Sequence, residues 1–204
     1  MGSETVGEPR GNIFASPTWT WSISPDQPSH RMTAKLYRLP HPASVYQAVV
    51  RQRFPAAFLD ARMLTGSILD LQIACCKALA RHSRQSMLTK SLPMEMLYAL
   101  SPRTGISDAL KLLGFKADCE WVVVLWIIPA NEQVPSPSMQ AFESLLAQEK
   151  GQEFAFSDLT RLSDFNKIAQ VYDFPMDLPE AYAHSPTWKR FLLSHVTSKI
   201  AIKE

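Results

Sequence analysis

The sequence predicts an α+β fold, in which a small mixed, largely antiparallel sheet packs with several helices in a single domain. The apolar run 120–128 has the β-branched and aromatic composition of a strand covered on both faces, and Pro129 stops it. Several other segments repeat their apolar residues at helical spacing. Strands and helices do not alternate as in a doubly wound sheet, which favours α+β over α/β.

The first half of the chain is expected to begin with a hairpin. Residues 18–23 alternate aromatic and polar side chains, and residues 32–39 form a second strand. The stretch 24–29, with two prolines, is predicted to be the loop between them. A helix at 43–53 and a short strand at 56–59 follow.

The longest helix is predicted to begin after Ser67 and to run to about Ser83. Asp70 stands three residues after Ser67, as in a capping box. Helical spacing predicts that this helix forms a main wall of the core through Ile68, Leu69, Ile73, Cys76, Leu79 and Ala80.

The stretch 88–115 predicts two short helices around a sharp corner. Ser91 is the expected N-cap of the first helix, with Pro93 in its first turn, and Ser101 before Pro102 ends it. After the turn at 103–105, Ser107 is the expected N-cap of the second helix. Its inward residues are predicted to be Ala109, Leu110 and Leu113, and Gly114 is expected in the left-handed conformation just past its end.

The remaining elements follow the central strand. We expect a helix from Ser136-Pro137 to Gly151, a short strand at 153–156, a helix at 164–172, a linker at 173–184 and a last helix capped by Ser185-Pro186. Residues 1–17 are rich in Gly, Pro and Ser and are predicted to be a disordered tail, which leaves 18–204 as the single domain.

Composition and motifs restrict the possible functions. The net charge is only +2, and the three cysteines lack disulfide or metal spacing. No phosphate-binding glycine loop or nucleophile motif is present, and the five histidines are scattered. The N-terminus lacks an apolar signal core, and no apolar run is long enough for a bilayer. We therefore expect a soluble intracellular chain with no catalytic residues, cofactor, metal or membrane contact. A small hydrolase or transferase remains an alternative, because catalytic groups meet only in space.

Charge is distributed unevenly. Between Asp70 and Asp108 the only acidic residue is Glu95, whereas the basic residues are Lys77, Arg81, Arg84, Lys90 and Arg103. Such a set suits phosphate contacts, although a solvated helix face has the same pattern.

The last helix is apolar on more than one side. Trp188, Phe191 and Leu192 are typical of a core face, and Leu193, Val196, Ile200 and Ile202 extend the apolar surface. A terminal helix of this kind packs both on its own domain and on another chain.

The corner also carries a family motif. Lys90-Ser91-Leu92, Glu95, the run 100–102, the run 106–109 and Gly114 resemble the TPRKB-type (PRPK-binding protein) family, the small kinase-associated subunit of the KEOPS/EKC complex, here in a fungal form. Weaker similarities to that family follow at 57–60, 151–156, 168–172 and 192–199, so that the resemblance covers about residues 18–204.

The resemblance implies a non-catalytic subunit that binds and regulates a PRPK-like atypical kinase/ATPase. Through it the chain would join the threonylcarbamoyl transferase and the other KEOPS subunits, which make tRNA threonylcarbamoyladenosine (t6A). It also implies recruitment of tRNA by its 3′ CCA end, a location in nucleus and cytoplasm and, in fungi, a link to telomeres. A stand-alone RNA-binding module is the other alternative.

Site residues can be assigned on this basis. The expected tRNA contacts are Lys77, Arg81, Arg84, Lys90 and Arg103. The expected kinase interface consists of Leu192, Leu193, Val196, Lys199 and Ile200.

Overall fold

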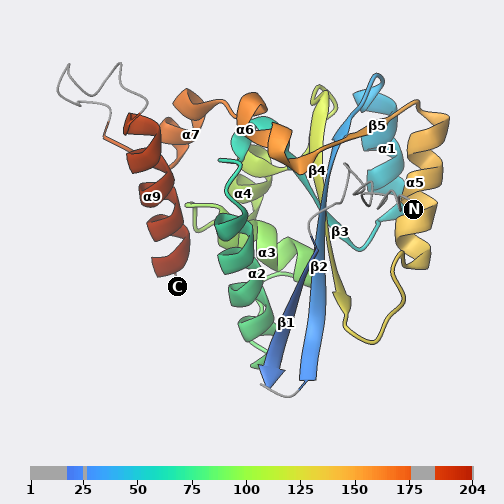
Figure 1. Cartoon of the computed structure of the whole chain (residues 1–204), viewed down its shortest axis with the longest axis horizontal. Coiled ribbons are helices and arrows are strands. Elements are labelled where there is room, and N and C mark those ends of the chain that lie inside the picture. The colour runs from blue at the N-terminus through green and yellow to red at the C-terminus, as the bar shows by residue number, and fades with distance from the viewer. Residues whose placement is uncertain (1–17, 25–26, 176–186, 204) are drawn as a thin grey trace, which may run out of the picture.

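The computed structural model describes residues 18–24, 27–175 and 187–203 of the chain. Its centre is an antiparallel sheet with helices on both faces (Figure 1). The strands are β1 (Thr18–Ser24), β2 (Gln27–Arg38), β3 (Ala56–Asp60), β4 (Trp121–Pro129) and β5 (Gln152–Phe154). They are ordered β1-β2-β4-β3, and β5 pairs with the end of β2 beyond the part that pairs with β1. The α+β prediction is confirmed, and every pairing between the named strands is antiparallel.

Strand β4 occupies the middle of the sheet, as its composition predicts. Every residue from Val122 to Ile128 is buried. Val123, Leu125 and Ile127 face one apolar cluster, and Val122, Val124 and Trp126 face the other. The alternation of a strand therefore divides the core into two layers.

The two layers hold different helices. On one face lie α1 (Pro42–Gln52) and α5 (Pro137–Gln148). The other face is covered by α2 (Ile68–Ser83), α3 (Leu92–Leu100), α4 (Ile106–Leu113), α7 (Phe165–Val171) and α9 (Thr187–Ile202). The structure also contains three short elements that the sequence did not predict. They are η1 (Ala61–Met63), between β3 and α2, and η2 (Phe156–Asp158) and α6 (Leu159–Leu162), between β5 and α7. No helix among the described residues is long and apolar enough to cross a membrane.

The predicted loop at 24–29 is wrong in its second half, because β2 already begins at Gln27. Pro28 pairs with Ser22 at a register shift, where the ladder is irregular. It also lies outside the part of β2 that pairs with β4. A proline without an N–H is tolerated there since no central hydrogen bond is lost.

The predicted face of α2 is also wrong. Ile68, Leu69, Cys76 and Ala80 are exposed. Of the predicted stripe, Leu79 is buried and Ile73 is partly buried against the core. The other buried residues of α2 are Asp70, Leu71, Ala74, Cys75 and Ala78. Apolar residues occur all around this helix, so that periodicity did not determine its orientation. Packing against α3 and α9 selects the buried face. Ser67 makes no side-chain cap, so the predicted capping box is absent.

The corner at 88–115 forms as predicted, with three local differences. Gly105, not Ser107, is the N-cap of α4, and Leu110 is largely exposed while Ala109 and Leu113 are buried. Gly114 is extended, with φ −69°, rather than left-handed. Glycine is needed there for another reason, because a Cβ atom would lie 2.5 Å from the carbonyl oxygen of Leu110.

Other predictions agree with the structure or lie outside the described residues. Ser91 and Ser136 occupy the N-cap positions of α3 and α5, and the Ser136 hydroxyl accepts a hydrogen bond from the N–H of Met139. The tail 1–17, most of the linker 173–184 and the cap Ser185-Pro186 lie outside the described residues.

Candidate functional site

The end of α2, helix α3 and the end of α9 meet in one charged contact, which we call the joint and define as Lys77, Arg81, Glu95, Tyr98 and Lys203. Glu95 of α3 is fully buried. One carboxylate oxygen accepts a hydrogen bond from Arg81 at 2.9 Å, and the other accepts from the backbone N–H groups of Leu88 and Thr89 at 3.0 and 2.9 Å. Burial raises the pKa of Glu95, but the hydrogen bonds from Arg81 and Thr89 outweigh it and hold the pKa below its usual value.

Two lysines complete the joint. Lys77 Nζ donates to the carbonyls of Ile200 at 2.9 Å and Ala201 at 3.0 Å, and also to that of Lys203. Lys203 Nζ in turn donates to the carbonyls of Tyr98, Ser101 and Arg103, at 2.6, 2.8 and 2.7 Å. Burial lowers the pKa of Lys203 to about 8, and the charges of Arg81 and Lys77 act in the same direction. Lys77 thus binds carbonyl groups at the end of α9, and Lys203 binds carbonyl groups at the end of α3 and in the turn that follows it.

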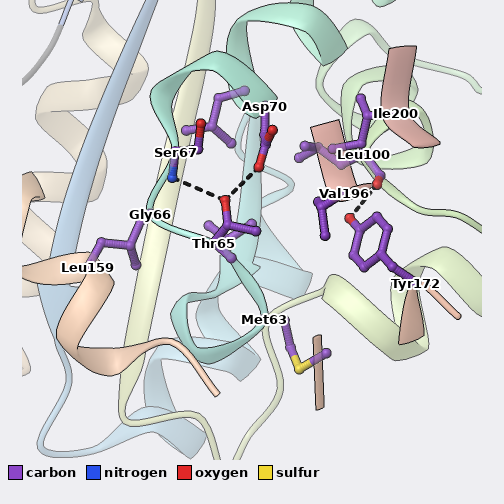
Figure 2. A pocket seen from close by; sticks show the side chains of 12 residues that line it. Met63, Thr65, Gly66, Ser67, Asp70, Leu100, Leu159, Tyr172, Val196 and Ile200 are labelled. Carbon is purple, nitrogen blue, oxygen red and sulfur yellow. Dashed lines mark hydrogen bonds between the residues drawn. The ribbon is translucent and has the colours of Figure 1, made fainter. Parts of the chain in front are cut away.

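A second polar contact ties the start of α2 to α9. Asp70 accepts hydrogen bonds of 2.5 Å from the hydroxyls of Thr65 and Thr197. Burial raises the pKa of Asp70, although both hydroxyls act against it. Figure 2 shows the Thr65–Asp70 bond beside the bond of 2.7 Å from the Tyr172 hydroxyl to the Leu100 carbonyl. The cavity between them has a volume of about 10 Å³, roughly the space of one water molecule, so the Asp70 contact is structural.

The structure separates the five expected tRNA contacts into two groups. Lys77 and Arg81 belong to the joint, and Arg81 also lies over the Tyr98 ring, 5.5 Å from its centre. Arg84, Lys90 and Arg103 are exposed. Lys90 precedes α3 and Arg103 follows it, so about 13 Å of helix separates them. The tRNA contact stays a prediction, now carried at the surface by these last three residues.

The five expected kinase contacts lie together on α9 but face different ways. Leu192, Val196 and Ile200 are buried in the core of this chain. Leu193 and Lys199 are partly exposed, and Phe191 on the same helix is 51% exposed. The kinase contact also stays a prediction, and its surface in this chain consists of the exposed side of α9.

The described residues also bring together groups that sequence reasoning did not connect. Arg62 binds the carboxylate of Asp60 through two nitrogen atoms, at 3.0 and 2.8 Å, and the Cys119 thiol lies 3.3 Å from Asp60. Burial and the Asp60 charge raise the pKa of Cys119, so the thiol stays protonated and weakly nucleophilic. Among the residues that the structure describes, no three metal-ligating side chains lie together.

A groove of about 530 Å³ lies between α1, β3, α3 and α4. Its lining is mostly apolar, and it was not predicted because it is built from four segments far apart in the sequence. Val50 of α1 and Leu110 of α4 lie on opposite sides of it.

Comparisons with known proteins identify the family. A family model described as the kinase binding protein CGI-121 matches residues 37–204. The EKC/KEOPS complex subunit CGI121 of Candida glabrata is 31% identical over 120 residues, which cover 58% of this chain and 65% of the relative. The subunit of the same name in Candida albicans is 27% identical over 101 residues, 45% of this chain and 50% of the relative.

A vertebrate relative is similar as well. The EKC/KEOPS complex subunit TPRKB of Danio rerio is 25% identical over 103 residues, 50% of this chain and 55% of the relative. The matches thus span about half to nearly two thirds of the length of these relatives. The family model itself extends from β2 to the end of α9, and the chain belongs to the CGI-121 family of kinase-binding proteins.

Proposed function

We propose that this chain is a non-catalytic subunit of an EKC/KEOPS complex that binds and regulates a PRPK-like kinase/ATPase. The match of the kinase-binding family model to residues 37–204 carries the proposal. The names of the relatives, all of them EKC/KEOPS subunits, support it. Through the kinase the chain would join the threonylcarbamoyl transferase and the other subunits that make t6A.

The exposed side of α9 supports a kinase contact by its rigidity. Leu192, Val196 and Ile200 anchor the helix in the core, and Lys77 binds its last carbonyls. Phe191 and Leu193 are therefore presented from a fixed element, which lowers the entropy lost on binding.

Co-purification tests this contact. The full chain, mixed with the PRPK-like kinase of the same organism, is expected to elute with it in gel filtration and to change its ATPase rate. Phe191→Asp and Leu193→Asp should each weaken kinase binding at least tenfold, because a carboxylate replaces apolar contact area. Leu69→Asp is the matched control, since Leu69 on α2 is also 51% exposed. Absence of any association between pure components would overturn the proposal.

A tRNA role belongs to the same proposal. Arg84 and Lys90 are exposed and form no ion pair within the described residues, while Arg103 lies 3.9 Å from Asp173. We assign to these three the phosphate contacts that bring a tRNA to the complex by its 3′ CCA end. Lys77 and Arg81 support them indirectly, because the joint holds both ends of α3.

Charge reversal tests the tRNA contact. Arg84→Glu, Lys90→Glu and Arg103→Glu should each weaken binding of the complex to tRNA. Each should also lower the slope of the logarithm of affinity against the logarithm of salt concentration by about one, because one cation fewer neutralises a phosphate. A tRNA without its CCA end should bind less well. Arg38→Glu is the control, because Arg38 lies on β2 and pairs with Glu120. Affinities equal to that of the wild type at several salt concentrations would remove this assignment.

The cellular part of the proposal follows from the complex. Loss of the chain should lower t6A in tRNA, measured by mass spectrometry of nucleosides, and a fluorescent fusion should appear in nucleus and cytoplasm. The same deletion strain shows whether telomere length also depends on the chain. Normal t6A in that strain would contradict the proposal.

A further inference from the structure

The groove beside β3 is bordered by a helix from each layer of the core. Helix α1 forms one wall, α3 and α4 form the other, and the edge strand β3 lies between them. The lining includes the rings of Phe54, Phe58 and Phe115 and the side chains of Val50, Met94 and Leu110. At about 530 Å³ it has room for two or three large side chains.

The walls expose apolar side chains that the fold of this chain does not use. Val50 is 58% exposed and Leu110 is 40% exposed, one on each side of the groove. Leu110 belongs to a helix whose buried residues are Ala109 and Leu113. Exposed apolar residues that line one hollow are typical of a surface that a partner covers.

The charges around the groove are positive. Among the described residues, Arg53 is the charged residue of the lining, and no carboxylate lines it. Lys90 stands next to the lining residue Ser91, and neither Arg53 nor Lys90 forms an ion pair within the described residues.

A second hollow, near η1, is also lined by cations but differs from the groove in its charge. Lys111, Lys116 and Lys167 line it together with Asp60, Arg62 and Asp118. Lys111 lies 3.8 Å from Asp108, and Lys167 lies 3.2 Å from Asp164. Carboxylates oppose the cations there, whereas the described lining of the groove beside β3 contains none.

The groove suits apolar side chains better than stacked bases. Its rings are tilted against one another: the centres of Tyr46 and Phe115 are 5.7 Å apart at 64°, and those of Phe54 and Phe58 are 6.4 Å apart at 57°. Beside these rings, Val49, Val50, Leu97 and Leu110 contribute aliphatic side chains to the lining. Single-stranded nucleic acid instead needs open ring faces on which bases stack.

We propose that the groove beside β3 binds an amphipathic helix of a partner protein. Two or three large apolar side chains of that helix, spaced i, i+3 or i+4, and i+7, enter the groove between Val50 and Leu110. Carboxylates that flank the apolar face meet Arg53 and Lys90. None of the described residues of α9 lines this groove, so it is a surface separate from the kinase contact proposed on α9. It shares Lys90 with the proposed tRNA contact.

A labelled peptide tests the proposal on the full chain. The probe is a stapled helix of about 16 residues with leucines at i, i+3, i+4 and i+7 and glutamates on both flanks, and its binding is followed by fluorescence anisotropy. We expect saturable binding that falls at least tenfold in the double variant Val50→Glu, Leu110→Glu. Leu69→Glu should stay within twofold, because Leu69, with an exposure between those of Val50 and Leu110, lies on a helix outside the groove. Unchanged melting temperatures show that the variants are folded.

A charge swap sharpens the result. The double variant Arg53→Glu, Lys90→Glu should bind the glutamate peptide at least threefold more weakly than the wild type does. It should bind a peptide with lysines on its flanks more tightly than the wild type does. Absence of saturable binding, or equal binding by wild type and groove variants, overturns the proposal. A 12-nucleotide single-stranded RNA serves as a second probe. If the wild type binds it, the peptide does not displace it and the Val50→Glu, Leu110→Glu variant no longer binds it, the groove is assigned to nucleic acid. A dimer that the same variant dissociates would assign it to a second copy of the chain.

Discussion

The joint and the loop that leads into it place the same kinds of side chain in opposite environments. At the joint, Arg81 and Lys203 turn inward and bind a buried carboxylate and three carbonyl groups. In the loop a few residues away, Arg84 and Lys90 point into solvent without an ion pair among the described residues. A basic stretch of sequence can therefore hold two sets of cations, one structural and one available for binding.

Removing the buried carboxylate should have the largest effect. Glu95→Ala leaves Arg81 and two backbone N–H groups without their acceptor, and we expect a loss of about 3–5 kcal/mol in the free energy of unfolding. Urea denaturation measures it. Glu120→Ala is the control, because Glu120 pairs with Arg38 where both side chains are 50% exposed, and about 0–1 kcal/mol is expected. Similar losses in both variants would remove the distinction between the two environments.

Removing the second lysine of the joint should have a smaller effect. Lys203→Met keeps most of the apolar chain but leaves the carbonyls of Tyr98, Ser101 and Arg103 without their donor, so we expect a loss of about 1.5–3 kcal/mol. Thermal unfolding of the full chain checks it. Lys111→Met, on the exposed side of α4, should stay within about 0.5 kcal/mol. An unchanged melting temperature for Lys203→Met would contradict a structural role of the chain's end.

Asp70 should make the free energy of unfolding depend on pH. Because its folded pKa is raised, the folded chain holds this proton more tightly than the unfolded chain does. The contribution of Asp70 to stability is thus present below the ordinary carboxyl pKa and is lost as pH rises through the raised one. In Asp70→Asn, the free energy of unfolding should no longer fall with rising pH through this group. At neutral pH it should differ from the wild-type value by about 1 kcal/mol.

Asp164 provides the matched control for Asp70. The N–H of Lys167 holds the pKa of Asp164 below its usual value, so its contribution is lost as pH falls. Asp164→Asn should therefore alter the dependence of the free energy of unfolding on pH at acid pH. There it removes a loss of stability that occurs as pH falls, not as pH rises. Identical curves for the two variants would contradict the assigned environments.

The exposed cations should have the smallest effect on stability. Arg84→Ala and Lys90→Ala should each change the free energy of unfolding by less than about 0.5 kcal/mol, because neither residue forms an ion pair within the described residues. Arg81→Ala, three residues before Arg84, should cost several-fold more, since it leaves Glu95 buried without its cation. A large loss in Arg84→Ala would show that the loop is structural as well.

Local sequence patterns predicted most of the elements. The run 120–128 predicted the buried central strand, and Ser91, Pro93 and Pro102 predicted α3 and its end. These patterns succeed because capping, proline geometry and side-chain alternation depend on neighbours within a few residues. They gave the wrong orientation for α2, because small and large apolar residues surround that helix and only its packing partner selects a face.

The sequence alone predicted the α+β class, the corner at 88–115 and the family motif within that corner. Which cations are structural depended on the tertiary structure, since Lys77 meets Ile200 and Lys203 meets Tyr98, partners more than 100 residues away. Tertiary packing also turns Leu192, Val196 and Ile200 toward the core, and it brings α1, β3, α3 and α4 around a groove. Periodicity reports that a side chain is apolar or charged, whereas its burial and partner depend on segments that only folding brings together.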